Sequence, residues 1–472
     1  MTAPQVPARG GPAGEVEAAL YEVRRKIYPR AVHGWFARWR WALVWFTQAI
    51  FYGLPWLSWG SRPAVLFDLE ARRFYLFGIV LYPQDFIYLT GLLVISALAL
   101  FLFTAVAGRL WCGYACPQTV YTEIFMWIEH RIEGDRTARM KLDRSPMSAR
   151  KLALKGTKHL LWILVALWTG ITFVGYFTPI RELLGALLTL STGPWQTFWV
   201  LFYGFATWGN AGFLREQVCK YMCPYARFQG VMFDKDTLVI TYDRERGEPR
   251  GPRSRKADPR GAGLGDCVDC NICVHVCPTG IDIRDGLQYE CIGCAACIDG
   301  CNQVMDRMGY PHGLIRYTTE NALERKLEPA AIVRRVLRPR VLVYSAVLLA
   351  ATLALFGHLA LRAPLKLDVI RDRALGREVE DGRIENGYQL QIINSAERTR
   401  RFRVTVSGID TIFVAGGSEF EVGPAGVRMV PLPVRVEAGH GEPGSNRIAF
   451  HVHAEDDPSV SAEAHSTFFV PR

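Results

Sequence analysis

Residues 267–278 read CVDCNICVHVCP, and residues 291–302 repeat the same spacing as CIGCAACIDGCN. Each run places four cysteines in the order C-x2-C-x2-C-x3-C, followed by Pro278 in the first run and by Asn302 in the second. Three thiolates on one short loop can bind three irons of a cubane, and the doubled run is typical of proteins that hold two 4Fe–4S clusters. We therefore predict a two-cluster, ferredoxin-like α+β insert.

In this pattern the fourth cysteine of each run binds the other cluster, so the predicted ligand sets are crossed. Gly280 and Gly293 suit a close approach of the backbone to the cubanes. Two zinc sites are the alternative. Zinc usually takes two short C-x2-C pairs per ion, however, and two matched runs of four cysteines do not resemble that pattern. The first predicted set is Cys267, Cys270, Cys273 and Cys301, and the second is Cys291, Cys294, Cys297 and Cys277.

The insert lies in a chain of 472 residues that is 50% hydrophobic and 12% aromatic, above the usual balance of soluble proteins. Five windows without a charged residue have about the 20-residue length that a bilayer requires. They are residues 41–59, 86–107, 160–180, 195–214 and 341–361. We predict five membrane spans, and we expect the shorter apolar run at 74–83 to lie on the interface or re-enter the protein.

Lys and Arg residues give the predicted orientation, because positive loops stay in the cytoplasm. Seven of them precede the first span and ten lie between the second and third, whereas the loop after the first span has three. This places the N-terminal segment 1–40 and the cluster domain 243–340 in the cytoplasm of a bacterial inner membrane. The net charge of +10 then reflects loop bias, so no nucleic-acid partner is needed. We expect no cleavable signal peptide, since the first apolar stretch starts late and lacks a cleavage site.

The predicted membrane domain covers residues 41–242, with four spans, and the fifth span at 341–361 leads to a periplasmic domain at 363–472. Short alternating segments in that domain predict an all-β, immunoglobulin-like sandwich without cysteines. His451 and His453 share one strand face, and we interpret them as solvent-facing rather than as a metal site. The expected strands are 388–393, 402–406, 411–414, 420–422, 429–436, 448–452 and 467–470.

The remaining four cysteines form two C-x3-C-P motifs, one after the second span (Cys112, Cys116) and one after the fourth (Cys219, Cys223). The matched pairs indicate an internal repeat. A proline after the second cysteine favours a helix that starts there, where the partial positive charge stabilises a thiolate. Thiolates select Cu(I) or zinc, and Met222 offers a thioether. Inert buried thiols are the alternative, and a c-type haem is excluded because no C-x2-C-H occurs.

Taken together, WCGYACPQTVYTE at 111–123, CKYMCPYARFQG at 219–230, the doubled cluster run and the terminal sandwich resemble the CcoG (also FixG or RdxA) family. These are accessory proteins for assembly of cbb3-type cytochrome c oxidase. The C-x3-C-P pair alone is also similar to the NapH and NosR membrane ferredoxins. The resemblance implies reduction of Cu(II) to Cu(I), with Cys112, Cys116, Cys219 and Cys223 as the catalytic, copper-binding residues. The partners implied are copper ions, a soluble cytosolic electron donor, and copper-handling and oxidase assembly proteins.

Three functions thus compete. The first is a cupric reductase whose cubanes feed electrons to copper at the C-x3-C-P thiolates. The second is an electron conduit to quinone or to a periplasmic redox partner. Against it, the sequence has no haem ligand pair or flavin signature that would carry electrons across the bilayer. The third is a non-catalytic assembly scaffold, for which two clusters would be superfluous. The sequence favours the reductase.

Overall fold

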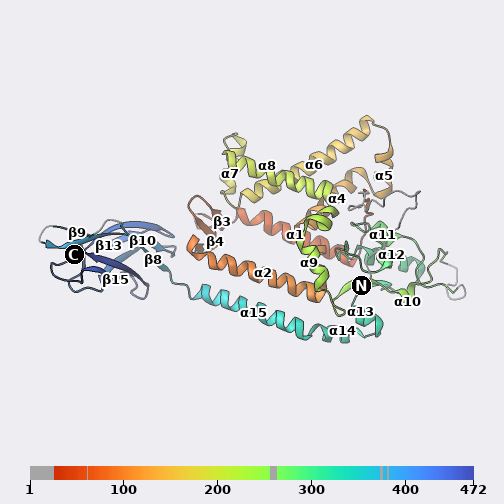
Figure 1. Cartoon of the computed structure of the whole chain (residues 1–472). Coiled ribbons are helices and arrows are strands. Elements are labelled where there is room, and N and C mark those ends of the chain that lie inside the picture. Colours follow the sequence, from red (N-terminus) through yellow and green to blue (C-terminus); the bar gives the residue numbers. More distant parts are fainter. Residues whose placement is uncertain (1–25, 61, 256–262, 373–375, 380–381, 472) are drawn as a thin grey trace, which may run out of the picture.

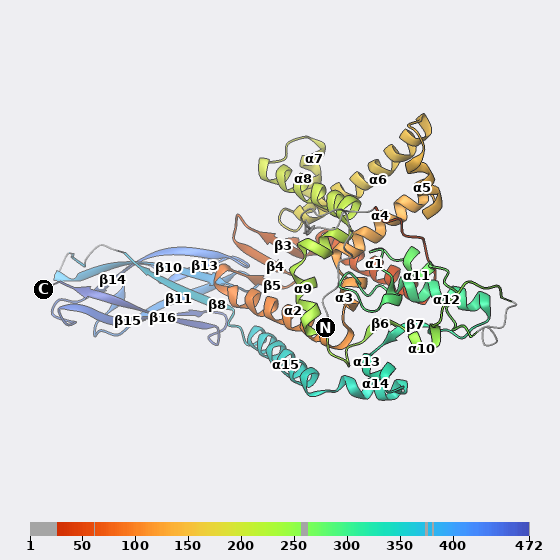
Figure 2. The same ribbon diagram turned by 45° about the vertical axis from the view of Figure 1, so that its right-hand side comes forward.

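The computed structural model describes residues 26–60, 62–255, 263–372, 376–379 and 382–471. A β-sandwich lies at one end, helices fill the middle, and the cysteine-rich domain lies at the other end (Figures 1 and 2). Three helical segments are long and apolar enough to cross a membrane: Pro83–Ala107, Ala149–Val174 and Pro339–Ala360. Residues 1–25 of the predicted N-terminal segment and 256–262 of the cluster-domain linker lie outside the described residues.

The first and fourth predicted spans are helical but fall short of these criteria. Helix α1 (Trp35–Gly53) carries Arg38 and Arg40 in its first two turns. Helix α8 (Pro194–Gly209) has 16 residues and continues into a π-helical segment at Asn210–Leu214. Three of the five predicted spans are therefore supported by length and composition, and the total of five stays a prediction.

Two of the spans, α2 (Phe86–Ala107) and α15 (Pro339–Ala360), run antiparallel and lie side by side (Figures 1 and 2). Gly91 allows the close approach, since a Cβ there would lie 2.7 Å from Leu355 Cδ1. Near the sandwich end, Tyr88 Oη is 2.8 Å from His358 Nδ1. Leu93 and Leu353 are more than 60% exposed, as expected for helices that face lipid rather than a protein core.

The third span, α6 (Ala149–Val174), packs against α8, where a Cβ on Gly170 would lie 2.3 Å from the Val200 carbonyl oxygen. Small residues permit such backbone contact between membrane helices. At its other end α6 packs on α4 (Pro117–Glu133), where the rings of Phe125 and Trp162 stack 5.1 Å apart. Shorter helices complete this part: α3 (Leu110–Tyr114), α5 (Arg136–Arg144), α7 (Ile180–Leu188) and α9 (Pro224–Met232).

The cysteine-rich domain is built on two antiparallel strands, β6 (Val239–Tyr242) and β7 (Ile315–Thr318). Strand β6 lies just before residue 243, the predicted start of the cluster domain, and pairs with β7 inside it. In the segment before the cysteine runs, Arg253 donates to the Gly265 carbonyl at 2.6 Å. Helices α10 (Arg244–Gly247), α11 (Ile272–His275), α12 (Ala296–Met308) and α13 (Glu320–Glu324) flank the strands, and α14 (Pro329–Val336) leads to α15.

Helix α1 receives its N-terminal cap from the cysteine-rich domain. The carboxylate of Asp299, in α12, accepts hydrogen bonds from the backbone N–H groups of Phe36 at 3.3 Å and Ala37 at 2.7 Å. These groups have no partner within α1, and a carboxylate also favours the positive end of the helix dipole. A Cβ on Gly34 would lie 2.3 Å from the Asp299 carboxyl group, so only glycine fits there. The cap ties a membrane helix to the cluster domain.

The apolar run at 74–83, expected to lie on the interface or to re-enter the protein, lies between the membrane helices and the sandwich (Figure 1). It forms strands β4 (Arg73–Leu76) and β5 (Ile79–Leu81), which pair with β3 (Val65–Asp68). A short ribbon, β1 (Ser58–Trp59) with β2 (Arg62–Pro63), precedes them. Val80 and Tyr82 pack against Ile393 and Ala425 of the sandwich. The alternating side chains thus serve as a docking platform between membrane helices and sandwich.

The C-terminal domain is the predicted sandwich of two antiparallel sheets. One sheet has the order β12–β14–β10–β8 with β9 beside β10, and the other β13–β11–β15–β16. Phe402, Phe450 and Phe468 are fully buried between them. Two strands that were not expected come first, β8 (Leu365–Arg371) and β9 (Arg377–Glu378). Each expected strand is present: β10 (Ile384–Asn394), β11 (Arg400–Ser407), β12 (Phe413–Val414), β13 (Glu419–Val422), β14 (Val427–Val436), β15 (Gly444–Ala454) and β16 (Ser461–Val470).

Candidate redox site

Two small cavities in the cysteine-rich domain are each bordered by four of the predicted ligands. Cys267, Cys270, Cys273 and Cys301 line the first cavity. Cys277, Cys291, Cys294 and Cys297 line the second, which Cys273 also borders. The fourth cysteine of each run therefore lies with the first three of the other run, which is the crossed arrangement that the spacing predicts.

The backbone explains how each run encloses a cavity. The residues on both sides of the second cysteine have positive φ in each run: Asp269 and Asn271 in the first, Gly293 and Ala295 in the second. Asn271 and Ala295 then precede the helices α11 and α12, which carry the third cysteine. The two loops are thus related by the same local turns. Gly280 also has positive φ, so its role as a flexible backbone position agrees with the prediction.

The donor chemistry fits iron–sulfur clusters. Burial raises the pKa of Cys301 to about 12, and the neighbouring Cys273, Cys270 and Cys267 add to this effect. Four thiols this close cannot all ionise without cations among them. Within the residues that the structure describes, no three His, Cys, Asp or Glu side chains converge on a single-ion site. The spacing therefore suits a multi-iron cluster better than one zinc ion, and the individual ligand assignments stay predictions.

The two C-x3-C-P motifs have matching backbones. In each motif the N–H of the second cysteine donates to the carbonyl of the residue before the first cysteine, Cys116 to Trp111 at 3.0 Å and Cys223 to Val218 at 2.8 Å. Cys116 and Cys223 are the N-cap residues of α4 and α9. This agrees with the predicted helix starts and with an internal repeat. The motifs differ in one respect, because the turn of the second, Val218–Met222, is π-helical.

The four motif cysteines come together, and we call them the four-thiol site. Burial raises the pKa of Cys219 to about 12, followed by contributions from Cys116, Cys112 and Cys223. Burial likewise raises the pKa of Cys112 to about 11. Gln229 Nε2 donates to the Cys112 sulfur at 3.3 Å, and this hydrogen bond lowers the pKa in part. Two thiols suffice for a linear Cu(I) site.

Two details of the sequence expectation are corrected here. The helix start was expected to favour a thiolate at Cys116, but burial raises the pKa of that thiol and outweighs the lowering by the backbone N–H groups of Gln118 and Thr119. The thiol is therefore protonated at neutral pH until a cation binds. Met222 was considered as a thioether ligand, but its side chain is 59% exposed, which argues against that role.

The four-thiol site abuts the second cluster cavity. A Cβ on Gly113 would lie 2.7 Å from the Gly293 carbonyl oxygen and 2.9 Å from Cys294 Cα, so the backbones are in contact. Arg109 reinforces the junction, donating to the carbonyls of Cys291 at 3.0 Å and Ala226 at 3.2 Å. Neither contact was predicted from the sequence, although Gly113 lies within the WCGYACP motif and Arg109 lies two residues before it.

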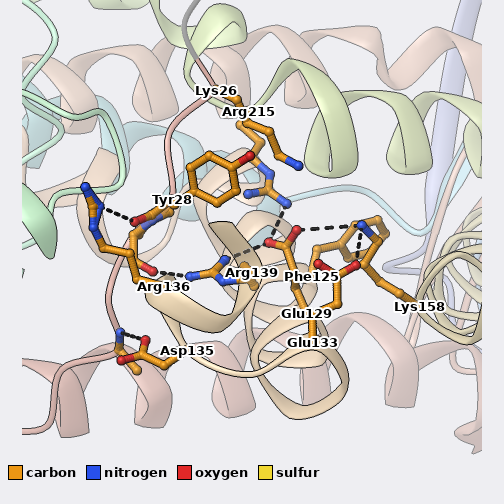
Figure 3. A network of polar contacts seen from close by, with 12 residues as sticks. Lys26, Tyr28, Phe125, Glu129, Glu133, Asp135, Arg136, Arg139, Lys158 and Arg215 are labelled. Atoms are coloured by element: carbon orange, nitrogen blue, oxygen red, sulfur yellow. Dashed lines mark hydrogen bonds and ion pairs between the residues drawn. The ribbon is translucent and has the colours of Figure 1, made fainter. Parts of the chain in front are cut away.

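Polar contacts hold the second motif in place relative to the first. Gln118, directly after Cys116-Pro117, donates from Nε2 to the carbonyls of Asn210 at 3.0 Å and Arg215 at 3.1 Å. Arg215 and Arg139 each lie 3.0 Å from Glu129 Oε2, and Lys158 lies 2.9 Å from Glu133 (Figure 3). These cations hold the pKa of Glu129 below its usual range against the opposing effect of burial.

The sandwich histidines do not form a comparable centre. His451 Nε2 lies 2.9 Å from Ser407 Oγ, and its Nδ1 lies 3.7 Å from Glu463. The side chains of His451 and Glu463 are both exposed, in agreement with the interpretation of His451 as a solvent-facing strand residue.

Comparison with known proteins follows the same division of the chain. A family model for a 4Fe–4S dicluster domain matches residues 214–320, one for a 4Fe–4S binding domain matches 89–134, and one for an immunoglobulin-like fold at the C-terminus of FixG matches 355–471. The nitrogen fixation protein FixG of Rhizobium meliloti is 40% identical, covering 97% of this chain and 95% of that protein. Protein RdxA of Cereibacter sphaeroides is 42% identical, covering 82% and 84%. The ferredoxin-type protein NapH of Haemophilus influenzae is 23% identical, covering 45% and 66%.

Proposed function

Because the chain belongs to the FixG/RdxA family of membrane-associated iron–sulfur electron-transfer proteins, we propose that it reduces Cu(II) to Cu(I) at the four-thiol site. In this proposal Cys112, Cys116, Cys219 and Cys223 bind the copper. The observation that carries it is the backbone contact of Gly113 with Gly293 and Cys294. This contact joins a thiol-rich site to a cluster loop with no intervening side chain.

The thiols suit the product of this reaction. The two clusters, when bound, supply electrons one at a time. Soft sulfur ligands stabilise Cu(I) over Cu(II), so binding at two of the thiols favours the reduced ion. Each thiol that binds copper loses its proton. Without copper the thiol stays protonated, because its pKa is raised. Gln229, fully buried beside Cys112, orients that sulfur through its amide group.

The direction of electron flow follows from exposure. Cys270, in the first ligand set, is exposed, whereas the second set borders the four-thiol site. A soluble cytosolic donor would therefore reduce the first cluster, and the second would pass the electron to copper. In the proposed topology the N-terminus and the cluster domain are cytoplasmic and the sandwich is periplasmic. Copper-handling proteins and cbb3-type oxidase assembly proteins are the proposed recipients of Cu(I).

A second candidate is an electron conduit to quinone or to a periplasmic partner. It is favoured by the match of residues 89–134, which include Cys112 and Cys116, to a 4Fe–4S binding domain, and by the likeness to NapH. In that case the four thiols would hold a further iron–sulfur centre. Iron content separates the two candidates, since a conduit needs more iron than two cubanes contain.

The test compares anaerobic Cu(II) reduction by the reduced protein with that of the double variants Cys112→Ser with Cys116→Ser, and Cys219→Ser with Cys223→Ser. We expect both variants to lose copper binding and reduction while retaining the visible absorbance of two clusters. Met222→Leu is the matched control, because this exposed residue lies within the second motif. Unchanged reduction in both double variants, with clusters intact, would refute the proposed copper site.

A further inference from the structure

A cavity of about 1030 Å³ lies between α1, α4 and the loop of the second cluster. Its wall includes Cys219 of the four-thiol site and Cys294 of the second ligand set. A molecule in this cavity would touch both redox centres at once. The volume is at the upper end of the range for small-molecule sites in proteins.

The wall carries an excess of positive charge. Six arginines and two glutamates line it, a formal excess of four with the histidines neutral: Arg30, Arg38, Arg40, Arg131, Arg139 and Arg215, against Glu123 and Glu216. Two carboxylates pair with these arginines, Glu129 at 3.0 Å from Arg139 and Arg215, and Asp135 at 3.8 Å from Arg30. Including both leaves an excess of two, and Asp299, whose carboxyl group lies against the backbone of Gly34 in the wall, reduces it to one. Four thiolates around a bound cluster would make the cluster loop negative. The positive charge therefore lies at the outer side of the cavity, where the exposed Arg38 and Arg131 favour an anion over a hydrated divalent cation.

One of these cations is buried and incompletely paired. Arg40 is 6% exposed and donates from Nη1 to the Cys294 carbonyl at 2.7 Å. Its Nη2 lies 3.7 Å from Glu123, and its buried Nε has no hydrogen-bond partner. A buried guanidinium group with an unpaired N–H is costly unless a ligand satisfies it. Arg40 is thus placed to hold an acceptor group directly beside the second cluster loop.

Aromatic side chains form the opposite rim. The rings of Trp41 and Trp127 meet edge to face with centroids 6.3 Å apart, joining α1 to α4. Arg131 lies over the Trp127 ring at 5.4 Å, which leaves the rim both apolar and cationic. Arg38 and Arg131 are exposed side chains at this rim, so they can act on a ligand before it enters.

We propose that this cavity admits copper as an anionic complex with a small carboxylate or thiolate ligand, and that it excludes hydrated Cu²⁺. The inference rests on the proposed copper reduction and specifies the form of its substrate. The clusters, when bound, would supply the one electron that converts Cu(II) to Cu(I), and the cytosolic donor would replace it. Two thiols of the four-thiol site would bind Cu(I), with release of their two protons and of the small ligand.

The test uses Cu(II) nitrilotriacetate, an anion, and the bis(ethylenediamine) complex of Cu(II), a cation. For each complex, the variants Arg38→Glu and Arg131→Glu are compared with the wild-type protein, so that intrinsic differences in potential cancel. We expect each charge reversal to lower kcat/KM for the anion about tenfold and to raise kcat/KM for the cation. High salt should weaken both effects, because it screens the charges. Arg150→Glu, an equal charge change at an exposed site outside the wall, is the matched control.

A binding measurement separates this inference from the proposed function. Quenching of tryptophan fluorescence reports binding of either complex to the oxidised protein, where no electron is transferred. Preferential binding of the anion, lost on Arg38→Glu or Arg131→Glu but kept in Arg150→Glu, supports the inference even if no copper is reduced. Reduction without such selectivity, or equal effects of all three reversals, would overturn it and leave the proposed function standing.

Discussion

Gly113 lies where the first C-x3-C-P motif touches the second cluster loop, and one added methyl group there tests that contact. In Gly113→Ala the new Cβ would lie 2.7 Å from the Gly293 carbonyl oxygen, 2.8 Å from its carbon and 2.9 Å from Cys294 Cα. All three are backbone atoms, so no side chain can rotate away. Overpacking of this kind costs about 1–3 kcal/mol, which corresponds to about a five- to hundredfold shift towards separated loops.

The assay follows reoxidation of the reduced clusters by Cu(II), from the recovery of their visible absorbance under anaerobic conditions. We expect the rate to fall at least about fivefold, the lower limit of that shift, with cluster content unchanged. Gly230→Ala is the matched control, since no atom lies within 4 Å of its added Cβ. If Gly113→Ala keeps its clusters and reoxidises as fast as Gly230→Ala, electrons do not reach copper through this contact.

The remaining predictions concern ligation, topology and stability. Cys301→Ser should remove the cluster of Cys267, Cys270 and Cys273, and EPR showing loss of the other cluster would contradict the crossed assignment. A reporter fused after residue 362 should be active in the periplasm and one at residue 263 only in the cytosol, and either reverse result would overturn the topology. Asp299→Ala should cost about 1–2 kcal/mol by uncapping α1, with Asp306→Ala, exposed in the same helix, as control in thermal unfolding. Glu129 has a lowered pKa in the folded protein, so its stabilisation is complete above the ordinary value of about 4.3 and is lost as pH falls through the folded value. After correction for the slower intrinsic exchange in acid, the protection of the α4 amide groups against hydrogen exchange should therefore fall on acidification, and unchanged protection would argue against the network.

The local features of this chain could be predicted from sequence because they depend on short-range patterns. Strands β10 to β16 follow from alternation of apolar and polar residues, and the doubled cysteine runs follow from spacing. Strand β8 was missed because its seven residues follow directly on α15, and its pairing with β10 depends on a partner that is distant in sequence. The strands at 74–83 could not be predicted from the apolar run alone, because its residues pack on the sandwich, which is distant in sequence.

The site was predictable in its ligands but not in its connections. Nothing local shows that Gly113 touches Gly293, or that Arg109 donates to Cys291, because these contacts join segments about 180 residues apart. The same holds for Glu129, which the structure buries between Arg139 and Arg215. The prediction of a thiolate at Cys116 was wrong for a related reason. Burial, a tertiary effect, raises the pKa of Cys116 more than the N–H groups at the helix N-terminus lower it.

The cap on α1 links cofactor maturation to membrane assembly. Helix α12 carries Cys297 and Cys301, which belong to different ligand sets, and Asp299 lies between them. Clusters bound at both ligand sets would hold this helix turn from two sides, and the same turn supplies the carboxylate that caps α1. By thermodynamic linkage, whatever stabilises the turn also favours the capped first helix. Bound iron would therefore add to the stability of a helix that contains none of the cluster ligands.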